Sequence, residues 1–106
     1  LDEDPKNISS LNNKGYALSK LKDFTRAMKY YDLALELCPD DLSVLINKIS
    51  SFRKQGNLIE ALSICDNILK NNSNYNVVLY HKERILFSMN KFLIFSCVIS
   101  SKVFAL

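Results

Sequence analysis

The sequence predicts an all-α protein, a solenoid of about three antiparallel helix pairs. Apolar residues recur at a fixed period of 34 residues, as Leu11, Leu45 and Leu79 show. A fixed period in this range is typical of stacked helical repeats. Within each period the apolar residues lie three or four positions apart, which places them on one face of a helix. The chain has only 2 Gly and 2 Pro, which also favours helices.

Composition limits the classes of function. At 106 residues the chain is one domain, and three periods fill nearly all of it, about the minimum that buries a continuous core. The net charge of +3 is too small to indicate nucleic-acid binding. The 3 cysteines are widely spaced and there is 1 histidine, so no zinc pattern occurs and reduced thiols are expected. We expect no metal, no cofactor and no catalysis, because no glycine-rich phosphate loop or Cys–His pairing is found.

The N-terminal residues indicate a place in a longer array. Residues 1–7 are acidic and polar, unlike a secretory signal peptide, so we expect a cytoplasmic, intracellular protein. Pro5 lies one period before Pro39. We therefore expect residues 1–7 to be the tail of a preceding repeat and a connector, and the chain to be part of a longer repeat protein.

Residues 8–41 form the first expected unit, with helices at 8–21 and 24–37. Asn7 and Asp23 are expected N-caps, since short polar side chains accept from the first backbone amides. Leu11, Lys14, Gly15 and Leu18 share a face of the first helix. In the second helix the apolar stripe comprises Phe24, Ala27, Met28, Tyr31, Ala34 and Leu35.

Residues 42–75 form the second expected unit, with helices at 42–55 and 58–71. Asp40 or Asp41 is expected to cap the first helix. Gly56-Asn57 marks the turn, and Asn57 followed by Glu60 resembles a capping box. The core candidates are Val44, Leu45, Ile49, Phe52, Leu58, Ala61, Leu62, Ile64, Cys65, Ile68 and Leu69.

Residues 76–106 form the third expected unit, which is divergent or truncated. A helix at 76–89 has Val78, Leu79, Ile85 and Leu86 as core candidates, and a turn is expected at Met89-Asn90-Lys91. The stretch that follows, residues 92–99, is apolar on every face. It is too short to span a bilayer, so we expect no membrane insertion. Such a helix needs a cover, which favours a homo-oligomer contact or a bound segment; a poorly ordered end is the alternative. The candidate contact residues are Phe92, Phe95, Val98 and Ile99.

The repeating unit resembles the tetratricopeptide repeat. Gly15, Ala27, Tyr31 and Pro39 match that family's pattern directly, with Leu11 and Leu18 as its large apolar residues, while Lys14 departs from the usual Leu. The resemblance implies that Gly15 allows close approach of the paired helix, with Ala27 as the small partner. The second unit keeps Leu45, Phe52 and Ala61 but has Ile49, Cys65 and Ser73 in the Gly, aromatic and Pro places. The third keeps Leu79, Leu86 and Phe92 but has Glu83, Phe95 and Lys102 in the Gly, Ala and second Ala places.

This resemblance implies a right-handed superhelix whose concave side is lined by the first helix of each unit and binds a partner's peptide. The implied lining is Asn12, Asn13, Tyr16, Ser19 and Lys20; Ile46, Asn47, Ser50, Arg53 and Lys54; and Val77, Tyr80, His81, Arg84 and Phe87.

Two features of this lining suggest how a peptide is held. Asn13, Asn47 and His81 lie one period of 34 residues apart. The carboxamide of an asparagine can both donate a hydrogen bond to a peptide unit and accept one from it. Lys20, Arg53, Lys54 and Arg84 favour an acidic partner. The alternatives are that Asn is common at this place and that the charges form an ordinary solvated face. The clamp with which some family members hold a chaperone's terminal carboxylate is not expected, because only Asn47 matches it.

We therefore predict a protein–protein interaction scaffold that binds a peptide in the concave groove. The competing hypothesis is a structural or oligomerising segment of a longer array that uses the apolar C-terminal helix. A third is an accessory domain of an enzyme encoded elsewhere in the full chain.

Overall fold

The computed structural model describes the backbone of residues 7–72 and 74–105 and the side chains of residues 7–72 and 74–90. This part of the chain contains helices and no strand, which confirms the predicted all-α class. The helices are α1 (Ile8–Lys20), α2 (Phe24–Leu37), α3 (Leu42–Gln55), α4 (Leu58–Asn71) and α5 (Asn76–Ala105). The bounds of the first four agree with the sequence prediction to within one residue.

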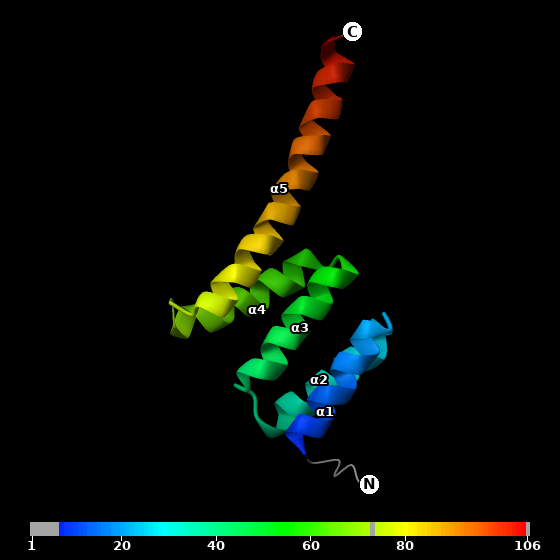
Figure 1. Cartoon of the computed structure of the whole chain (residues 1–106). Coiled ribbons are helices and arrows are strands. Elements are labelled where there is room, and N and C mark those ends of the chain that lie inside the picture. Colours follow the sequence, from blue (N-terminus) through cyan, green and yellow to red (C-terminus); the bar gives the residue numbers. More distant parts are fainter. Residues whose placement is uncertain (1–6, 73, 106) are drawn as a thin grey trace.

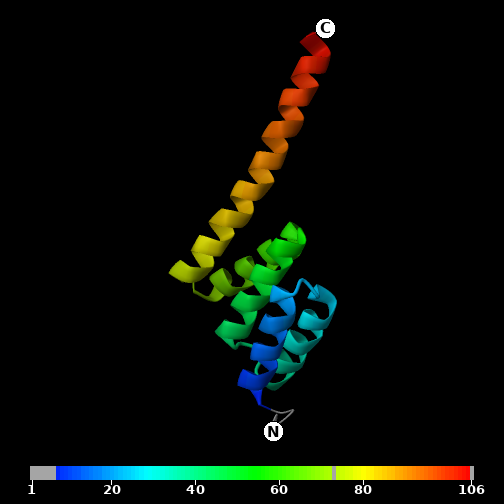
Figure 2. The ribbon, with the colours of Figure 1, turned by 45° about the vertical axis from the view of Figure 1, so that its right-hand side comes forward.

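The helices pack in the order in which they follow along the chain. α1 and α2 form one hairpin, α3 packs against both, and α4 packs on α3 (Figure 1). α5 packs on α4 and α3 and then continues beyond the other helices as a single rod (Figures 1 and 2). The first helices of the three expected units, α1, α3 and α5, therefore lie in sequence along the molecule.

One cluster of buried side chains joins α1, α2 and α3. It contains Leu11, Ala27, Tyr31, Ala34 and Val44. A Cβ atom on Gly15 would lie 2.6 Å from the Tyr31 ring, so the glycine makes room for that ring. The close contact expected at Gly15 is thus present, but its partner is Tyr31 rather than Ala27.

A second cluster joins α3, α4 and α5 and contains Ile49, Ala61, Cys65, Val78 and Ile85. Burial, followed by the nearby Asp66 carboxylate, raises the pKa of the Cys65 thiol to about 11, so the thiol is protonated at neutral pH. Leu86, a predicted core residue, is instead 43% exposed. It lies on a side of α5 that neither α3 nor α4 covers.

Most of the predicted helix ends are present. Asn7, Asp23 and Asp41 each accept a hydrogen bond from a backbone N–H three residues later. Gly56 has φ 93°, a left-handed conformation that glycine adopts without strain. Asn57 stands at the N-cap of α4 but makes no capping hydrogen bond, so the predicted capping box with Glu60 is not formed.

The predicted turn at Met89-Asn90-Lys91 is wrong. α5 runs through these positions as one helix of 30 residues, so the described residues 76–105 form a single helix and not a helix pair. The physical reason is that this stretch lacks both Gly and Pro, the residues that interrupt a helix most strongly. The candidate contact residues Phe92, Phe95, Val98 and Ile99 lie in the part of α5 whose side chains are not described. Residues 1–6, expected as the tail of a preceding repeat, lie outside the described backbone.

Candidate functional site

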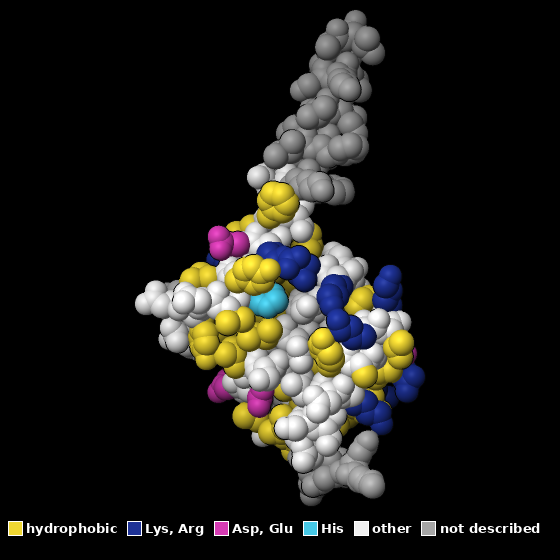
Figure 3. Space-filling model, viewed as in Figure 1, with side chains coloured by type: hydrophobic (Ala, Val, Ile, Leu, Met, Phe, Trp, Pro, Cys, Tyr) yellow, Lys and Arg dark blue, Asp and Glu magenta, His cyan; other side chains and the backbone are white. Residues whose placement is uncertain are grey.

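Side chains from α1, α3 and α5 share one surface, which we call the α1–α3–α5 face. Figure 3 shows this face, where Lys and Arg side chains gather beside the histidine and alternate with hydrophobic side chains. The predicted site residues Asn13, Tyr16, Lys20, Lys54, Tyr80 and Arg84 are exposed, whereas Asn12, Asn47, Ser50, Arg53 and His81 are half-buried. The half-buried polar side chains are partly fixed by neighbouring protein atoms and still present some surface to a ligand.

The asparagines of this face connect two units. The Asn47 side-chain N–H donates to the Asn12 side-chain oxygen over 2.9 Å, which joins α3 to α1. This bond leaves Asn47 its own carbonyl oxygen and a second N–H for another partner. Asn13 is exposed on the next position of α1. The sequence predicted Asn47 as a ligand contact, but did not predict that Asn12 holds its amide.

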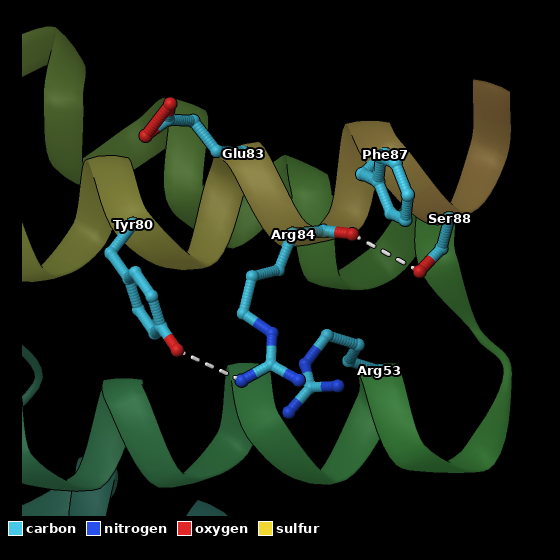
Figure 4. A pocket seen from close by; sticks show the side chains of 6 residues that line it. All are labelled: Arg53, Tyr80, Glu83, Arg84, Phe87 and Ser88. Atoms are coloured by element: carbon cyan, nitrogen blue, oxygen red, sulfur yellow. Dashed lines mark hydrogen bonds between the residues drawn. The ribbon is translucent and has the colours of Figure 1, made fainter. Parts of the chain in front are cut away.

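An open pocket of about 460 Å³ lies between α3 and α5 on this face. It is lined by Arg53, Tyr80, Glu83, Arg84, Phe87 and Ser88 (Figure 4). An Arg84 Nη1 N–H donates to the Tyr80 hydroxyl over 3.0 Å, and the guanidinium lies 5.6 Å from the ring centre. Figure 4 shows the Arg53 guanidinium next to that of Arg84. Glu83 and Ser88 were not predicted as site residues. Each is adjacent in sequence to a residue of the expected lining, Glu83 to Arg84 and Ser88 to Phe87, but is not part of that lining.

Positive charge dominates this pocket. Burial first, and then the Arg84 guanidinium, lower the pKa of Arg53. Burial first, and then Arg53 and Arg84, lower the pKa of His81, so the imidazole is neutral at pH 7. His81 also packs edge-on against Tyr80, with ring centres 5.7 Å apart. The arrangement is suited to an anion rather than a cation.

A second basic hollow lies at the C-terminal ends of α1 and α3. It has a volume of about 430 Å³ and is lined by Ser19, Lys20, Lys22, Phe24 and Lys54. The Lys20 ammonium also lies 5.3 Å from the centre of the Tyr16 ring. The four predicted basic residues therefore divide between two places, with Lys20 and Lys54 here and the two arginines in the other pocket. Lys22 was missed because it lies in a turn.

The described side chains contain no group of three or more His, Cys, Asp or Glu that could hold a metal ion. In that same part of the chain, no helix is long and apolar enough to cross a membrane.

The fold and this face define an all-helical repeat protein. The model of the Tetratricopeptide repeat family matches residues 8–41, the first expected unit. Residues 8–41 therefore have the pattern of a tetratricopeptide repeat. No curated protein and no solved structure matched the chain in similar searches. Tetratricopeptide repeats are generally protein–protein interaction modules and typically non-catalytic scaffolds.

Proposed function

We propose that the protein binds an extended peptide segment of a partner protein along the α1–α3–α5 face. The observation that carries this proposal is that polar and aromatic side chains of three successive first helices share that one face. Asn13, Asn47 and His81 offer hydrogen-bonding groups one period apart. Amide and imidazole groups that can pair with backbone N–H and C=O groups hold a peptide largely independently of its side chains.

The same proposal includes an acidic partner and the remaining units. The basic residues lie on the same three helices and would steer an acidic segment to this face; they are Lys20, Arg53, Lys54 and Arg84. Residues 42–75, with the α3–α4 pair, act as a second repeat, and residues 76–106, with α5, act as a divergent or truncated third repeat. We place this interaction in the cytoplasm.

A displayed library of random peptides tests the proposal, because it needs no known partner. Peptides enriched on the protein are measured by fluorescence anisotropy against the Asn13→Ala/Asn47→Ala double variant. We expect their affinity to fall at least tenfold, because two backbone-binding amides are lost. The control is Asn67→Ala, which removes an exposed amide from α4. Equal binding by the double variant, or failure of any peptide to enrich, contradicts the proposal.

A second candidate function is self-association through α5. The observation that favours it is the length of α5 that continues past the other helices (Figures 1 and 2). Phe87, near that boundary, is already 69% exposed. Light scattering across a tenfold concentration range tests this: a mass above 12.1 kDa that Phe95→Asp returns to the monomer value supports it. A constant monomer mass refutes it.

A further inference from the structure

We propose that the Arg53–Arg84 pocket binds a carboxylate of the partner peptide, while the Tyr80 and Phe87 rings beside it contact a neighbouring apolar side chain. This inference deepens the peptide-binding function proposed above and rests on it. It gives the partner a defined chemical feature, an acidic group next to an apolar residue.

The first argument is that two like charges converge without a balancing anion. Some other cations pair with carboxylates, as in Lys48–Asp32 and Lys82–Asp66, each at 2.7 Å. Among residues 7–72 and 74–90, no carboxylate forms an ion pair with Arg53 or Arg84. Glu83 lines the same pocket, but its carboxylate turns away from both guanidinium groups (Figure 4). A bound anion would remove the repulsion between the two arginines.

The second argument concerns buried hydrogen-bonding groups without partners. The Arg53 Nε atom and the His81 Nδ1 atom are both buried and have no hydrogen-bond partner. Buried polar groups without partners are uncommon in folded proteins, and a missing ligand is one accepted reason. A guanidinium presents Nε–H and Nη–H side by side, in the geometry that matches the two oxygens of a carboxylate. The unpaired Nε–H of Arg53 is one half of such a fork.

The third argument selects a carboxylate over a phosphate. Arg53 and Arg84 bring two positive charges to the pocket and Glu83 brings one negative charge. Glu83 forms no ion pair with either arginine, but its negative charge lies at the pocket and opposes a bound anion. It therefore disfavours a phosphate monoester, which carries about two negative charges at neutral pH, more than a carboxylate, which carries one. The aromatic rings of Tyr80 and Phe87 also line the pocket and are exposed, so they can contact an apolar peptide side chain.

The protein's single histidine provides a direct readout. His81 is next to the pocket, and the positive charges of Arg53 and Arg84 help to lower its pKa. A carboxylate bound between those arginines would offset their charge and so raise the pKa of His81. Because the chain has 1 histidine, its imidazole NMR signals need no assignment.

The experiment is an NMR titration of the His81 imidazole in the full chain with four probes. N-acetyl-Asp-Phe-amide carries a side-chain carboxylate, N-acetyl-Gly-Phe carries a terminal carboxylate, N-acetyl-Asn-Phe-amide carries neither, and inorganic phosphate is the fourth. We expect saturable shifts and a raised imidazole pKa with one or both carboxylate probes, at least tenfold weaker binding of the asparagine probe, and weaker binding of phosphate. The stronger of the first two probes identifies the source of the carboxylate.

Variants test whether the arginines are responsible. Arg53→Gln and Arg84→Gln should each weaken binding of the carboxylate probe at least fivefold. Arg84→Lys should recover only part of the lost affinity, because lysine restores the charge without the forked donors of the guanidinium. Lys29→Gln removes the same charge from the exposed surface of α2 and should have no effect. Circular dichroism checks that each variant is folded. Equal binding of the asparagine probe, tighter binding of phosphate, or no effect of either arginine variant overturns the proposal.

The two proposals fail in different ways. If library peptides depend on Asn13 and Asn47 but not on the arginines, the peptide-binding function stands and the carboxylate pocket is wrong. If the carboxylate probe depends on the arginines while library peptides ignore the asparagines, the pocket stands and the extended binding mode along the face is wrong.

Discussion

Gly15 shows how one residue fixes the packing of a helix pair. Alanine is a better helix former than glycine by about 1 kcal/mol, so Gly15→Ala would stabilise α1 if space allowed. The Tyr31 ring leaves no space, since a Cβ atom would lie 2.6 Å from it. Overpacking of this kind costs about 1–3 kcal/mol. We therefore expect Gly15→Ala to lower the free energy of unfolding by up to about 2 kcal/mol, measured by urea denaturation.

A second substitution identifies the ring as the cause. In a Tyr31→Leu background the clash is relieved, so Gly15→Ala should become neutral or stabilising. If Gly15→Ala costs the same in both backgrounds, the ring is not what the glycine accommodates. The sequence predicted the need for a small residue here, because it follows from the repeat pattern. It did not predict the partner, because spacing along two helices does not fix which facing side chain fills the gap.

His81 gives the stability of the protein a pH dependence of known sign. Its pKa in the folded protein lies below the usual value of 6.5, through burial and then through Arg53 and Arg84. As the pH falls below 6.5, the histidine of the unfolded chain is therefore protonated more readily than His81 in the folded protein. The free energy of unfolding consequently falls as the pH falls. A single proton gives at most about 1.4 kcal/mol per pH unit.

Urea denaturation at pH 7.5 and pH 5.5 measures this effect. The wild type should lose more stability between the two pH values than His81→Gln does, because the variant lacks the titrating group. The same pH dependence in both proteins would show that His81 is not responsible.

At the scale of the element, the positions of helix ends were predictable from short polar residues in the sequence. Whether each N-cap side chain accepts a backbone hydrogen bond was not predictable in every case. Asp41 and Asn57 both stand at N-caps, yet only Asp41 accepts a backbone hydrogen bond, from the Val44 N–H at 3.2 Å. A cap lost by substitution with alanine costs about 0.5–2 kcal/mol. We expect Asp41→Ala to cost about 1 kcal/mol and Asn57→Ala only a few tenths, measured by thermal and urea unfolding. Equal costs would mean that the Asn57 side chain caps α4 in solution.

α5 shows where the repeat pattern ceases to determine structure. The period of 34 residues placed a turn at Met89-Asn90-Lys91 by analogy with Lys22-Asp23 and Gly56-Asn57. A turn needs a local signal, and here neither Gly nor an N-cap with a partner amide provides one. The helix therefore continues through all 30 residues. The pocket was only partly predictable for a related reason: the sequence identified Arg53 and Arg84, but their proximity depends on how α5 packs on α3.

At the scale of the whole molecule, stability depends on how well adjacent units hold together. In repeat proteins each unit contacts only its neighbours, so the interface between units decides whether they unfold together. Here α3 bridges the two buried clusters, with Val44 in the first and Ile49 in the second. Two side-chain bonds reinforce the bridge from α1 to α3: Asn47 to Asn12, and Ser19 to Ser51.

The Ser19–Ser51 pair tests this coupling between units. Their hydroxyl oxygens are 2.7 Å apart, and both residues are buried. Removing one partner leaves the other hydroxyl buried without a bond, which costs about 1–3 kcal/mol, whereas removing both can be nearly neutral. We therefore expect Ser19→Ala and Ser51→Ala each to destabilise the protein, and the double variant to be more stable than either alone.

Urea unfolding followed by both tyrosine fluorescence and far-ultraviolet circular dichroism measures this double-mutant cycle. In the single variants the two signals should begin to separate as the units uncouple. Strictly additive costs with coincident transitions would show that the apolar contacts of α3, and not this hydroxyl pair, couple the two units.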